Sequence, residues 1–325
     1  MLPRTRSHRV LLLGGTGFVG RRLTWRLGRD GCNVRIPTRS YARNRDLSVS
    51  PDVELLEADV HDETALGSLL ANCDVAVNLV GILNEPGHDG SGFERAHAEL
   101  AAKLVRACRR AGVRRLLHMS ALKADADRGP SHYLRSKGRA ERHVAEGAGD
   151  EIAYTIFRPS VIFGADDSLL NRFASLLRLF PVLPLAAADA RFAPVFVDDV
   201  AEAFALALRE GSTRGKTYEL CGPEILSLEE IVRFVRAQLG LRRAIIKLPP
   251  ALSSLEAWIG EYLLPGKPFS RDNLASLRVA SVCASDGFEQ LGLRPRSLFS
   301  LSSELLGGDA RHRRLARLRE RAGRR

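Results

Sequence analysis

A tyrosine and a lysine four positions apart, Tyr133 and Lys137, are the side chains in this sequence best suited to move a proton. Residues four apart on a helix share one face, so both side chains can reach the same small volume. A lysine ammonium about 4 Å from a phenol supplies roughly the 4 kcal/mol that brings a tyrosine pKa from near 10 to near 7. Together with the hydroxyl of Ser120 upstream, the pair predicts proton transfer coupled to hydride transfer. The catalytic candidates are therefore Ser120, Tyr133 and Lys137.

The competing interpretation is a partly exposed helix on which the two residue types share a face by chance. The first apolar run of the chain argues against it. Residues 10–13 have the pattern of a buried parallel strand, and Gly14, Gly17 and Gly20 follow before a helical pattern over 18–27. Glycines let such a turn approach a pyrophosphate, which then binds N–H groups at the helix N-terminus. This turn predicts a dinucleotide site lined by Gly14, Thr16, Gly17, Phe18, Val19 and Gly20.

The elements that must position these residues alternate between strand and helix. Helical patterns cover 91–111 and about 133–146, and the predicted strands after the first are 33–37, 53–57, 75–80, 116–120 and 153–158. This alternation indicates an α/β fold: a Rossmann-type doubly wound parallel sheet with ligands at the carboxyl ends of its strands. We expect a dinucleotide-binding domain over 1–165, with 192–222 returning to it, a smaller and mainly helical C-terminal lobe over 166–310, and a basic tail over 311–325.

The residues after the second predicted strand bear on the choice of nucleotide. Folds selective for NAD place a carboxylate there for the ribose 2′-hydroxyl, whereas a 2′-phosphate favours arginine. This chain has Arg39 and Arg43 and no acid before Asp46. An arginine fork can hold the extra phosphate, so the sequence favours NADP(H), with NAD(H) as the second choice. The alternative is a solvated basic loop.

Other strand ends complete the predicted cofactor site. Asp59 and Val60 follow the third strand and are placed to meet the adenine edge, and Val80 and Gly81 let the chain pass beside the cofactor. Tyr133 and Lys137 belong to the same set, since the lysine can hold the nicotinamide ribose. The nicotinamide end would be walled by Pro159 and Val161.

The C-terminal half returns to the sheet and then builds a lobe. Residues 169–180 predict a helix, 181–188 a loop over the substrate side, and 192–197 a strand. Asp198 and Asp199 are interpreted as caps of a following helix over 201–208 rather than as catalytic residues. A capping box at Ser227–Glu230 opens another helix, and further helices are expected over 251–264 and 271–279.

Composition narrows the class of protein. The chain has 325 residues, 45% hydrophobic and 27% charged, and contains no apolar run approaching the roughly 18 residues of a membrane span. Five widely spaced cysteines without a Cys-x-x-Cys motif are interpreted as reduced thiols in a cytoplasmic protein, with the inner face of the membrane as a peripheral location. The eight histidines lack metal-ligand spacing, so no metal site is expected.

The net charge of +11 resides mostly in the tail. Residues 311–325 hold eight arginines against Glu320, which leaves +4 for residues 1–310. Such a tail could bind an anionic lipid surface or an acidic partner in a membrane-associated complex, or be a solvated helix end. Because no aromatic residues interleave it, binding to nucleic acid is not expected.

These motifs together resemble the short-chain dehydrogenase/reductase superfamily, in its extended or atypical branch. The chain is more closely similar to the NADPH-binding accessory subunit of respiratory complex I and its bacterial relatives. That likeness covers roughly residues 8–300 and rests on the motifs Asn78-Leu-Val-Gly81, His118-Met-Ser-Ala-Leu122, Tyr133-Leu-Arg-Ser-Lys137, the run from Arg158 to Asp167 that leads into Leu170-Asn-Arg-Phe-Ala-Ser175, and Ser270-Arg-Asp-Asn273.

The resemblance implies tight NADP(H) binding and leaves enzymatic activity open. If the protein is active, it implies an NAD(P)-dependent reductase of a small carbonyl or quinone, or an epimerase or dehydratase acting on a nucleotide sugar. Arg172 and Arg191 are the residues that would meet a sugar diphosphate. His97 lies where many enzymes of the superfamily have an active-site asparagine, so the resemblance does not extend to their proton relay.

Overall fold

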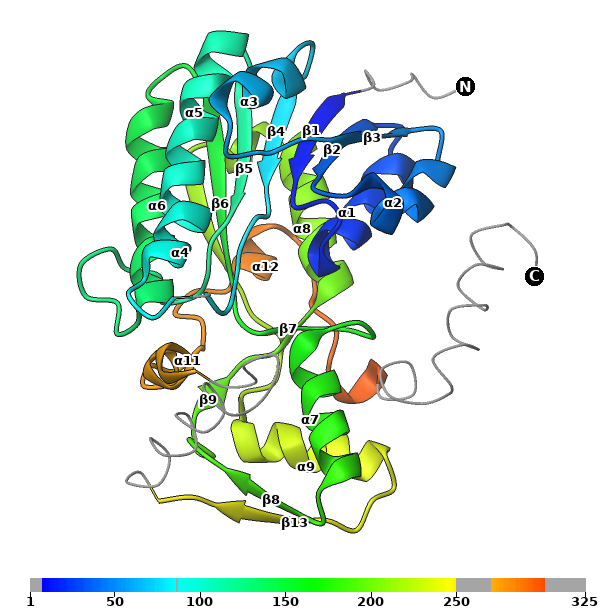
Figure 1. The fold of residues 1–325 in the computed structure, drawn as a ribbon, viewed down its shortest axis with the longest axis vertical. Coiled ribbons are helices and arrows are strands. Elements are labelled where there is room, and N and C mark those ends of the chain that lie inside the picture. Colours follow the sequence, from blue (N-terminus) through cyan, green and yellow to red (C-terminus); the bar gives the residue numbers. More distant parts are fainter. Residues whose placement is uncertain (1–7, 86, 250–269, 302–325) are drawn as a thin grey trace.

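A seven-stranded parallel sheet forms the centre of the protein (Figure 1). The computed structural model describes residues 8–85, 87–249 and 270–301. The strand order is β11-β6-β5-β4-β1-β2-β3, which confirms the predicted Rossmann-type fold. Its strands are β1 (Arg9–Leu13), β2 (Asn33–Thr38), β3 (Val53–Glu57), β4 (Val75–Asn78), β5 (Arg115–Met119), β6 (Ala153–Pro159) and β11 (Lys216–Leu220).

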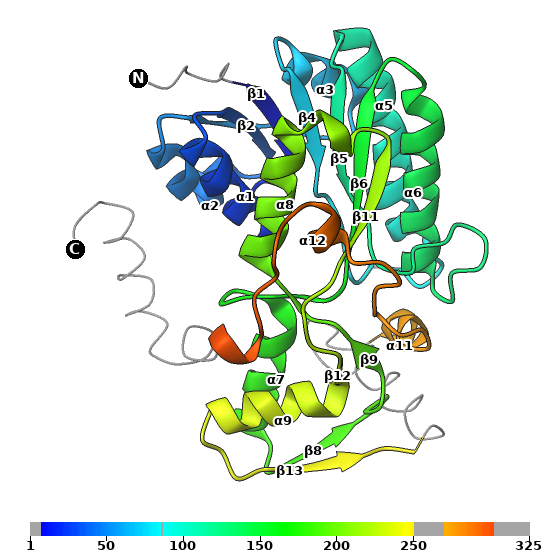
Figure 2. The same ribbon diagram turned by 180° about the vertical axis from the view of Figure 1, so that it is seen from behind.

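Helices cover both faces of this sheet, as the two opposite views show (Figures 1 and 2). Helices α1 (Phe18–Arg29) and α8 (Val197–Arg209) pack on one face, and α3 (Glu63–Leu70), α5 (Leu100–Ala111) and α6 (His132–Ala148) pack on the other. Strand β1 shows why the sequence does this. Val10 and Leu12 enter the first core, whereas Leu11 and Leu13 enter the second. A strand buried on both faces needs an uninterrupted apolar run.

The remaining elements lie mostly beyond the carboxyl ends of the strands (Figure 1). Three small sheets pair β7 with β10, β9 with β12, and β8 with β13. Their strands are β7 (Ile162–Phe163), β8 (Val182–Leu185), β9 (Arg191–Phe192), β10 (Val195–Phe196), β12 (Leu226–Ser227) and β13 (Ala244–Lys247). The helices are α2 (Tyr41–Asn44), α4 (Ser91–Phe93), a π-helix (Glu94–Glu99), α7 (Ser168–Leu179), α9 (Leu228–Gln238), α11 (Arg271–Ser276) and α12 (Gly287–Gln290), with 3-10 turns at Arg45–Val49, Gly211–Thr213 and Phe299–Leu301.

Two local interpretations of the C-terminal half were wrong. The expected loop at 181–188 contains β8, which pairs in parallel with β13, a partner sixty residues away that local sequence does not reveal. Asp198 and Asp199 do not cap α8, because β10 runs straight into the helix and Phe196 occupies the N-cap position. They lie in the first turn and bind Arg22 and Arg296 respectively.

Other expectations for this half had different outcomes. The capping box of α9 is confirmed, because the Ser227 hydroxyl accepts from the Glu230 N–H and the Glu230 carboxylate accepts from the Ser227 N–H. Helix α11 ends at Ser276, three residues before the predicted end. The expected helix over 251–264 and the basic tail over 311–325 lie outside the described residues.

The expectation that all five cysteines are reduced was wrong. Cys221, just after β11, forms a disulfide with Cys283, and the two Cα atoms are 6.0 Å apart. Their separation of 62 residues carries no signal in the sequence, since the fold brings them together. The other three cysteines, Cys32, Cys73 and Cys108, are free and buried.

Removing this disulfide should destabilise the protein by about 2–4 kcal/mol, because the unfolded chain then regains the entropy of a long open loop. The measurement is urea unfolding of the wild type and of the Cys221→Ser, Cys283→Ser double variant, each with and without a dithiol reductant. Reductant should shift the wild type alone, since the three remaining cysteines are unpaired. Superimposable unfolding curves for the two proteins would contradict the prediction.

A buried carboxyl group caps α7. Asp167 is 3% exposed, and its carboxylate accepts hydrogen bonds from the N–H groups of Leu170 (2.6 Å) and Gly164 (3.3 Å). Burial raises the pKa of Asp167 to about 6. The folded protein therefore binds this proton more tightly than the unfolded chain does. The resulting stabilisation is complete below about pH 4 and is lost as the pH rises through about 6.

The variant Asp167→Asn should remove this pH dependence while keeping an oxygen that accepts from Leu170. Between pH 4 and pH 7, the wild type should lose about 3 kcal/mol of unfolding free energy relative to the variant, which is two pKa units of differential binding. Urea unfolding at several pH values measures the difference. Parallel pH profiles for the two proteins would show that Asp167 is not the group responsible.

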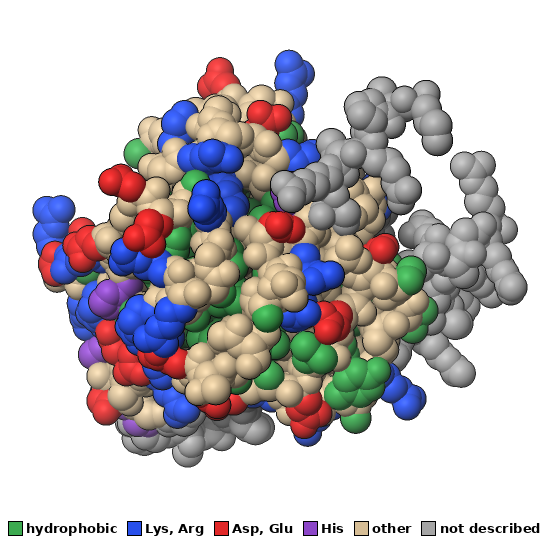
Figure 3. Space-filling view, turned by 90° about the horizontal axis from the view of Figure 1, so that it is seen from above, with side chains coloured by type: hydrophobic (Ala, Val, Ile, Leu, Met, Phe, Trp, Pro, Cys, Tyr) green, Lys and Arg blue, Asp and Glu red, His purple; other side chains and the backbone are tan. Residues whose placement is uncertain are grey.

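The surface of the described part mixes charges of both signs. In the view of Figure 3, Lys and Arg side chains lie among Asp and Glu side chains, and no patch of one sign covers that face. Several of these charges are paired, such as Arg109 with Glu151 at 2.8 Å. Among the described helices, none combines the length and apolar character that crossing a membrane requires.

Candidate functional site

The turn between β1 and α1 has the shape of a phosphate cradle. Gly14 has a φ of +79°, a conformation that favours glycine, and its carbonyl accepts the Gly17 N–H at 3.0 Å. A Cβ atom on Gly20 would stand 2.2 Å from that carbonyl oxygen, so the helix can approach the turn this closely only with glycine there. No side chain caps α1, whose first N–H groups are thus available to a phosphate. Thr16 lies in the turn, and Phe18 and Val19 are the first two residues of α1.

The end of β2 presents two arginines beside this turn. Arg39 and Arg43 are exposed, and neither forms an ion pair with any described residue. Asp46, the nearest downstream acid, is held by Arg21 at 2.6 Å. Arg21 also donates to the Thr16 carbonyl at 3.0 Å, so it ties the glycine turn to the segment that carries Arg39 and Arg43. The sequence analysis missed this role of Arg21.

The predicted adenine contacts lie at the end of β3. Asp59 is exposed and its carboxylate accepts the His61 N–H at 2.9 Å, while Val60 packs against the core beneath α5. Glu57 is an acid that the sequence analysis did not consider, and it accepts the Tyr41 N–H at 3.0 Å. This bond anchors the start of α2 to β3.

Lys137 joins the carboxyl ends of two neighbouring strands. Its ammonium donates to the carbonyls of Met119 (3.1 Å), the last residue of β5, and Val80 (3.5 Å), which follows β4. A Cβ on Gly81 would lie 3.2 Å from the Lys137 Nζ, so glycine keeps the space above the lysine open. Ser120 follows β5, and its buried Oγ has no hydrogen-bond partner among the residues that the structure describes.

Tyr133 occupies the first turn of α6, one helical turn before Lys137. Its ring meets His97 and Phe93 edge-on, with centroids 5.5 and 6.0 Å apart. Pro159 ends β6 and its carbonyl accepts the Leu122 N–H at 3.0 Å, while Val161 follows the strand and its carbonyl accepts an N–H from β10 at 2.9 Å. The structure thus brings the predicted residues to one edge of the sheet.

The comparisons with known proteins agree with this geometry. Residues 14–171 match the family model described as NAD(P)H-binding. NADH dehydrogenase (ubiquinone) 1 alpha subcomplex subunit 9, mitochondrial, of Arabidopsis thaliana is 30% identical over 312 residues, covering 91% of this chain and 76% of the relative. The protein of the same name from Mus musculus is 31% identical over 313 residues, covering 93% and 80%. The chain belongs to this subunit 9 family.

A solved structure shares the fold of this chain. The crystal structure of the NADPH-dependent quinone oxidoreductase QOR2 from Escherichia coli, complexed with NADPH, aligns with a TM-score of 0.71 at 21% identity and covers 90% of this chain and 98% of that one. The fold of this chain is therefore established. Its NAD(P)H-binding assignment rests on the family model that matches residues 14–171. Selectivity between NADP(H) and NAD(H) is a separate matter.

The electrostatics of Tyr133 differ from the sequence expectation. We expected the lysine to lower the tyrosine pKa, but burial raises the pKa of Tyr133 to about 12. Burial also lowers the pKa of Lys137 to about 8, and the Lys137 hydrogen bonds go to the two carbonyls rather than to the phenol. Desolvation therefore outweighs the charge attraction, and the phenol is protonated at neutral pH.

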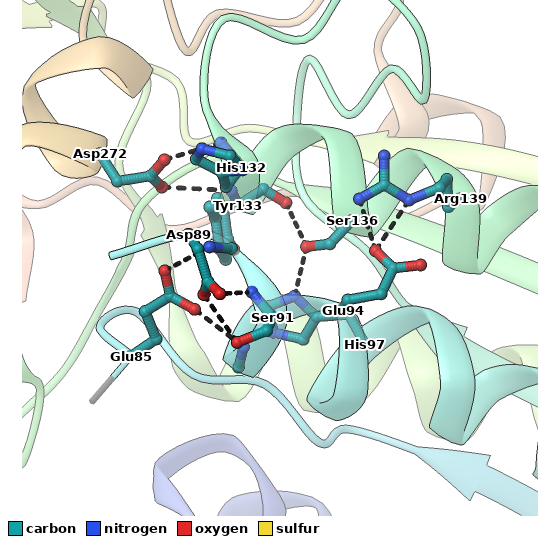
Figure 4. Close-up of polar contacts among 12 residues, drawn as sticks. Glu85, Asp89, Ser91, Glu94, His97, His132, Tyr133, Ser136, Arg139 and Asp272 are labelled. Atoms are coloured by element: carbon teal, nitrogen blue, oxygen red, sulfur yellow. Dashed lines mark hydrogen bonds and ion pairs between the residues drawn. The ribbon is translucent and has the colours of Figure 1, made fainter. Parts of the chain in front are cut away.

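The hydrogen bonds of His97 assign its tautomer, and the bond to Ser136 is drawn in Figure 4. The ring lies in the π-helix, and its Nε2 accepts the Ile82 N–H at 3.1 Å. Its Nδ1 therefore carries the hydrogen and donates to Ser136 Oγ at 2.8 Å, and Ser136 donates to the Tyr133 carbonyl at 2.8 Å. Burial, helped by the charge of Lys137, lowers the pKa of His97 to about 2. Both ring nitrogens are engaged in hydrogen bonds, so His97 links the loop after β4 to α6.

Proposed function

We propose that this protein holds NADP(H) tightly as a nucleotide-binding subunit, and that it is not a fast-turning-over enzyme. The observation that carries the proposal is the uncapped start of α1 beside a turn that only glycine fits, with two unpaired arginines one strand away. Backbone N–H groups would take the pyrophosphate, and Arg39 and Arg43 would take the ribose 2′-phosphate. Lys137 would reach the nicotinamide ribose.

The chemistry that a nicotinamide supplies is hydride transfer, and the side chains around it decide whether a proton can follow. A general acid or base works best when its pKa lies near the operating pH. Tyr133, with a pKa of about 12, and His97, with a pKa of about 2, are both far from that range. This is the reason for proposing retention of the nucleotide over rapid turnover.

A second candidate function is reduction of a small carbonyl or quinone. The observation in its favour is the buried, unpartnered Ser120 hydroxyl on the strand end that precedes the Tyr133 helix. An epimerase or dehydratase acting on a nucleotide sugar is not favoured, because the two relatives that align over more than 90% of this chain are named as NADH dehydrogenase subunits. Arg191, which would serve such a substrate, lies exposed on β9.

The names of these relatives also suggest a partner. They are subunits of a mitochondrial NADH dehydrogenase, and we propose that this chain likewise docks on a membrane-associated complex. Residues 311–325 would supply basic contacts to it or to anionic lipid.

Deleting residues 311–325 should weaken salt-sensitive binding to anionic vesicles, and unchanged binding would contradict this role. The division into 1–165, 166–310 and 311–325, with 192–222 returning, is part of the proposal.

The proposed function is tested on the purified protein in two steps. Mass spectrometry of the co-purified nucleotide should find NADP(H). The protein loaded with NADPH should then show no oxidation of the nucleotide during prolonged exposure to carbonyls and quinones. NADPH consumption that disappears in Tyr133→Phe would instead establish the enzyme. Absence of any bound nucleotide, with no binding at millimolar NADPH, would reject both functions.

A further inference from the structure

One segment crosses the ligand-bearing edge of the sheet, and we call residues 270–283 the strap. It begins with α11, which lies beneath the start of α6 in both ribbon views (Figures 1 and 2). The Asn273 side chain donates to Asn84 at 2.9 Å in the loop after β4. Farther along, the Ser281 carbonyl accepts from Ser160 Oγ at 2.7 Å after β6, and Cys283 is bonded to Cys221 after β11.

Between these points the strap contacts α6, the helix that follows β5. Its contacts therefore follow the order of four neighbouring strands, β4, β5, β6 and β11. Ser276 donates to the hydroxyl of Ser131, the N-cap residue of α6, at 2.8 Å. The strap is thus attached at four places along the edge where Ser120, Tyr133 and Lys137 lie.

Asp272 contacts the helical turn that carries Tyr133. Its carboxylate accepts the N–H groups of His132 at 2.7 Å and Tyr133 at 3.1 Å, the first two of α6 (Figure 4). Ser131 satisfies the next two, its hydroxyl accepting from Leu134 and its carbonyl from Arg135. All four N–H groups at this helix start have acceptors, and two of these bonds come from a residue about 140 positions away.

Helices α3, α7 and α9 have local N-caps. Each is capped by the residue directly before it, which is Asp62, Asp167 and Ser227 respectively. Helix α6 has its own cap in Ser131 and receives the Asp272 carboxylate in addition. A carboxylate at a helix N-terminus also opposes the positive end of the helix dipole. The added contact therefore fixes the first turn, which is the turn that carries Tyr133.

We propose that Asp272 is a positioning residue for the nicotinamide half of the site. By holding the first two N–H groups of α6, it sets where the Tyr133 ring and, one turn later, the Lys137 ammonium stand relative to the bound nucleotide. The inference rests on the proposed function, since NADP(H) is the ligand whose position would change. Asp272 acts through α6 and makes no contact with the nucleotide itself.

The test compares two probes of different length. NADPH spans the whole site, whereas adenosine 2′,5′-bisphosphate reaches only the half near Arg39. Asp272→Ala leaves two N–H groups without their acceptor and should weaken NADPH binding by about tenfold. Binding of adenosine 2′,5′-bisphosphate should stay within about twofold of the wild type. Asp272→Asn keeps one acceptor oxygen and should recover part of the NADPH affinity.

The matched control is Asp286→Ala. Asp286 likewise accepts two backbone N–H groups, those of Phe288 and Glu289, but it caps α12 rather than α6. This variant should leave the binding of both probes unchanged. Equal losses for the two probes in Asp272→Ala would mean general destabilisation and would overturn the inference, as would unchanged NADPH binding.

Amide hydrogen exchange separates this inference from the proposed function. In Asp272→Ala without nucleotide, the amides of His132 and Tyr133 should exchange faster, while those of Phe288 and Glu289 stay protected. If the wild type binds no NADPH, the proposed function fails, and the hold of Asp272 on α6 is then judged by exchange alone. Unchanged exchange at His132 and Tyr133 would overturn it.

Discussion

Gly20→Ala should abolish nucleotide binding, lowering the affinity for NADPH by more than about a hundredfold. The new methyl group would stand 2.2 Å from the Gly14 carbonyl oxygen and 2.6 Å from the Gly15 Cα. Both are backbone atoms that cannot rotate away, so the turn and the start of α1 must separate. Overpacking of this kind also costs about 1–3 kcal/mol of stability. Fluorescence titration with NADPH and thermal unfolding measure the two effects.

Gly28→Ala is the matched control for this substitution. Gly28 lies on the same helix, α1, and a Cβ atom there would meet no heavy atom within 4 Å. Alanine should therefore stabilise the helix by up to about 1 kcal/mol and leave NADPH binding unchanged. If Gly20→Ala bound NADPH as the wild type does, the β1–α1 turn would not be the phosphate site.

Arg39→Asp should reverse the preference between the two nicotinamide nucleotides. The substitution removes a guanidinium that would bind the 2′-phosphate and puts a repelling carboxylate in its place. Affinity for NADPH should fall at least tenfold, while affinity for NADH stays the same or rises, since a carboxylate can accept the ribose 2′-hydroxyl. Competition between the two nucleotides, followed by fluorescence, measures the ratio.

Arg178→Asp changes the net charge equally and serves as the control. Arg178 is exposed near the end of α7, on a helix beyond the sheet, so this variant should leave the nucleotide preference alone. A wild type that binds NADPH no better than NADH, with a ratio unmoved by Arg39→Asp, would end the case for NADP(H). The binding of a nicotinamide dinucleotide as such would be unaffected by that result.

The features that the sequence predicted are those that neighbouring residues determine. The apolar run of β1 meets a core on both faces, and its register follows from four consecutive residues. The glycines of the next turn follow in part from local geometry, since Gly14 has a positive φ and a Cβ on Gly20 would meet the backbone of Gly14 and Gly15. The Ser227–Glu230 capping box is likewise complete within four residues. Such local patterns were sufficient for the sheet and for the turn between β1 and α1.

What the sequence could not reveal depends on distant partners or on burial. The disulfide, the β8–β13 pairing and the Asp272 contact with α6 join segments 60 to 140 residues apart. The pKa of Tyr133 was misjudged for a related reason. Spacing alone indicated a nearby charge, but only the folded structure shows that burial raises the pKa of this phenol.

The position of the strap has a consequence for the growing polypeptide on the ribosome. The backbone contacts that require glycine in the β1–α1 turn all lie within the first eighty residues, and the most distant are those of Gly14 with Leu79 and Val80. Asp272 is synthesised much later, so the N–H groups of His132 and Tyr133 at the start of α6 lack this acceptor until it emerges. Under the proposed function, a chain that ends before Asp272 would therefore bind the adenosine half of the nucleotide without positioning the nicotinamide ring.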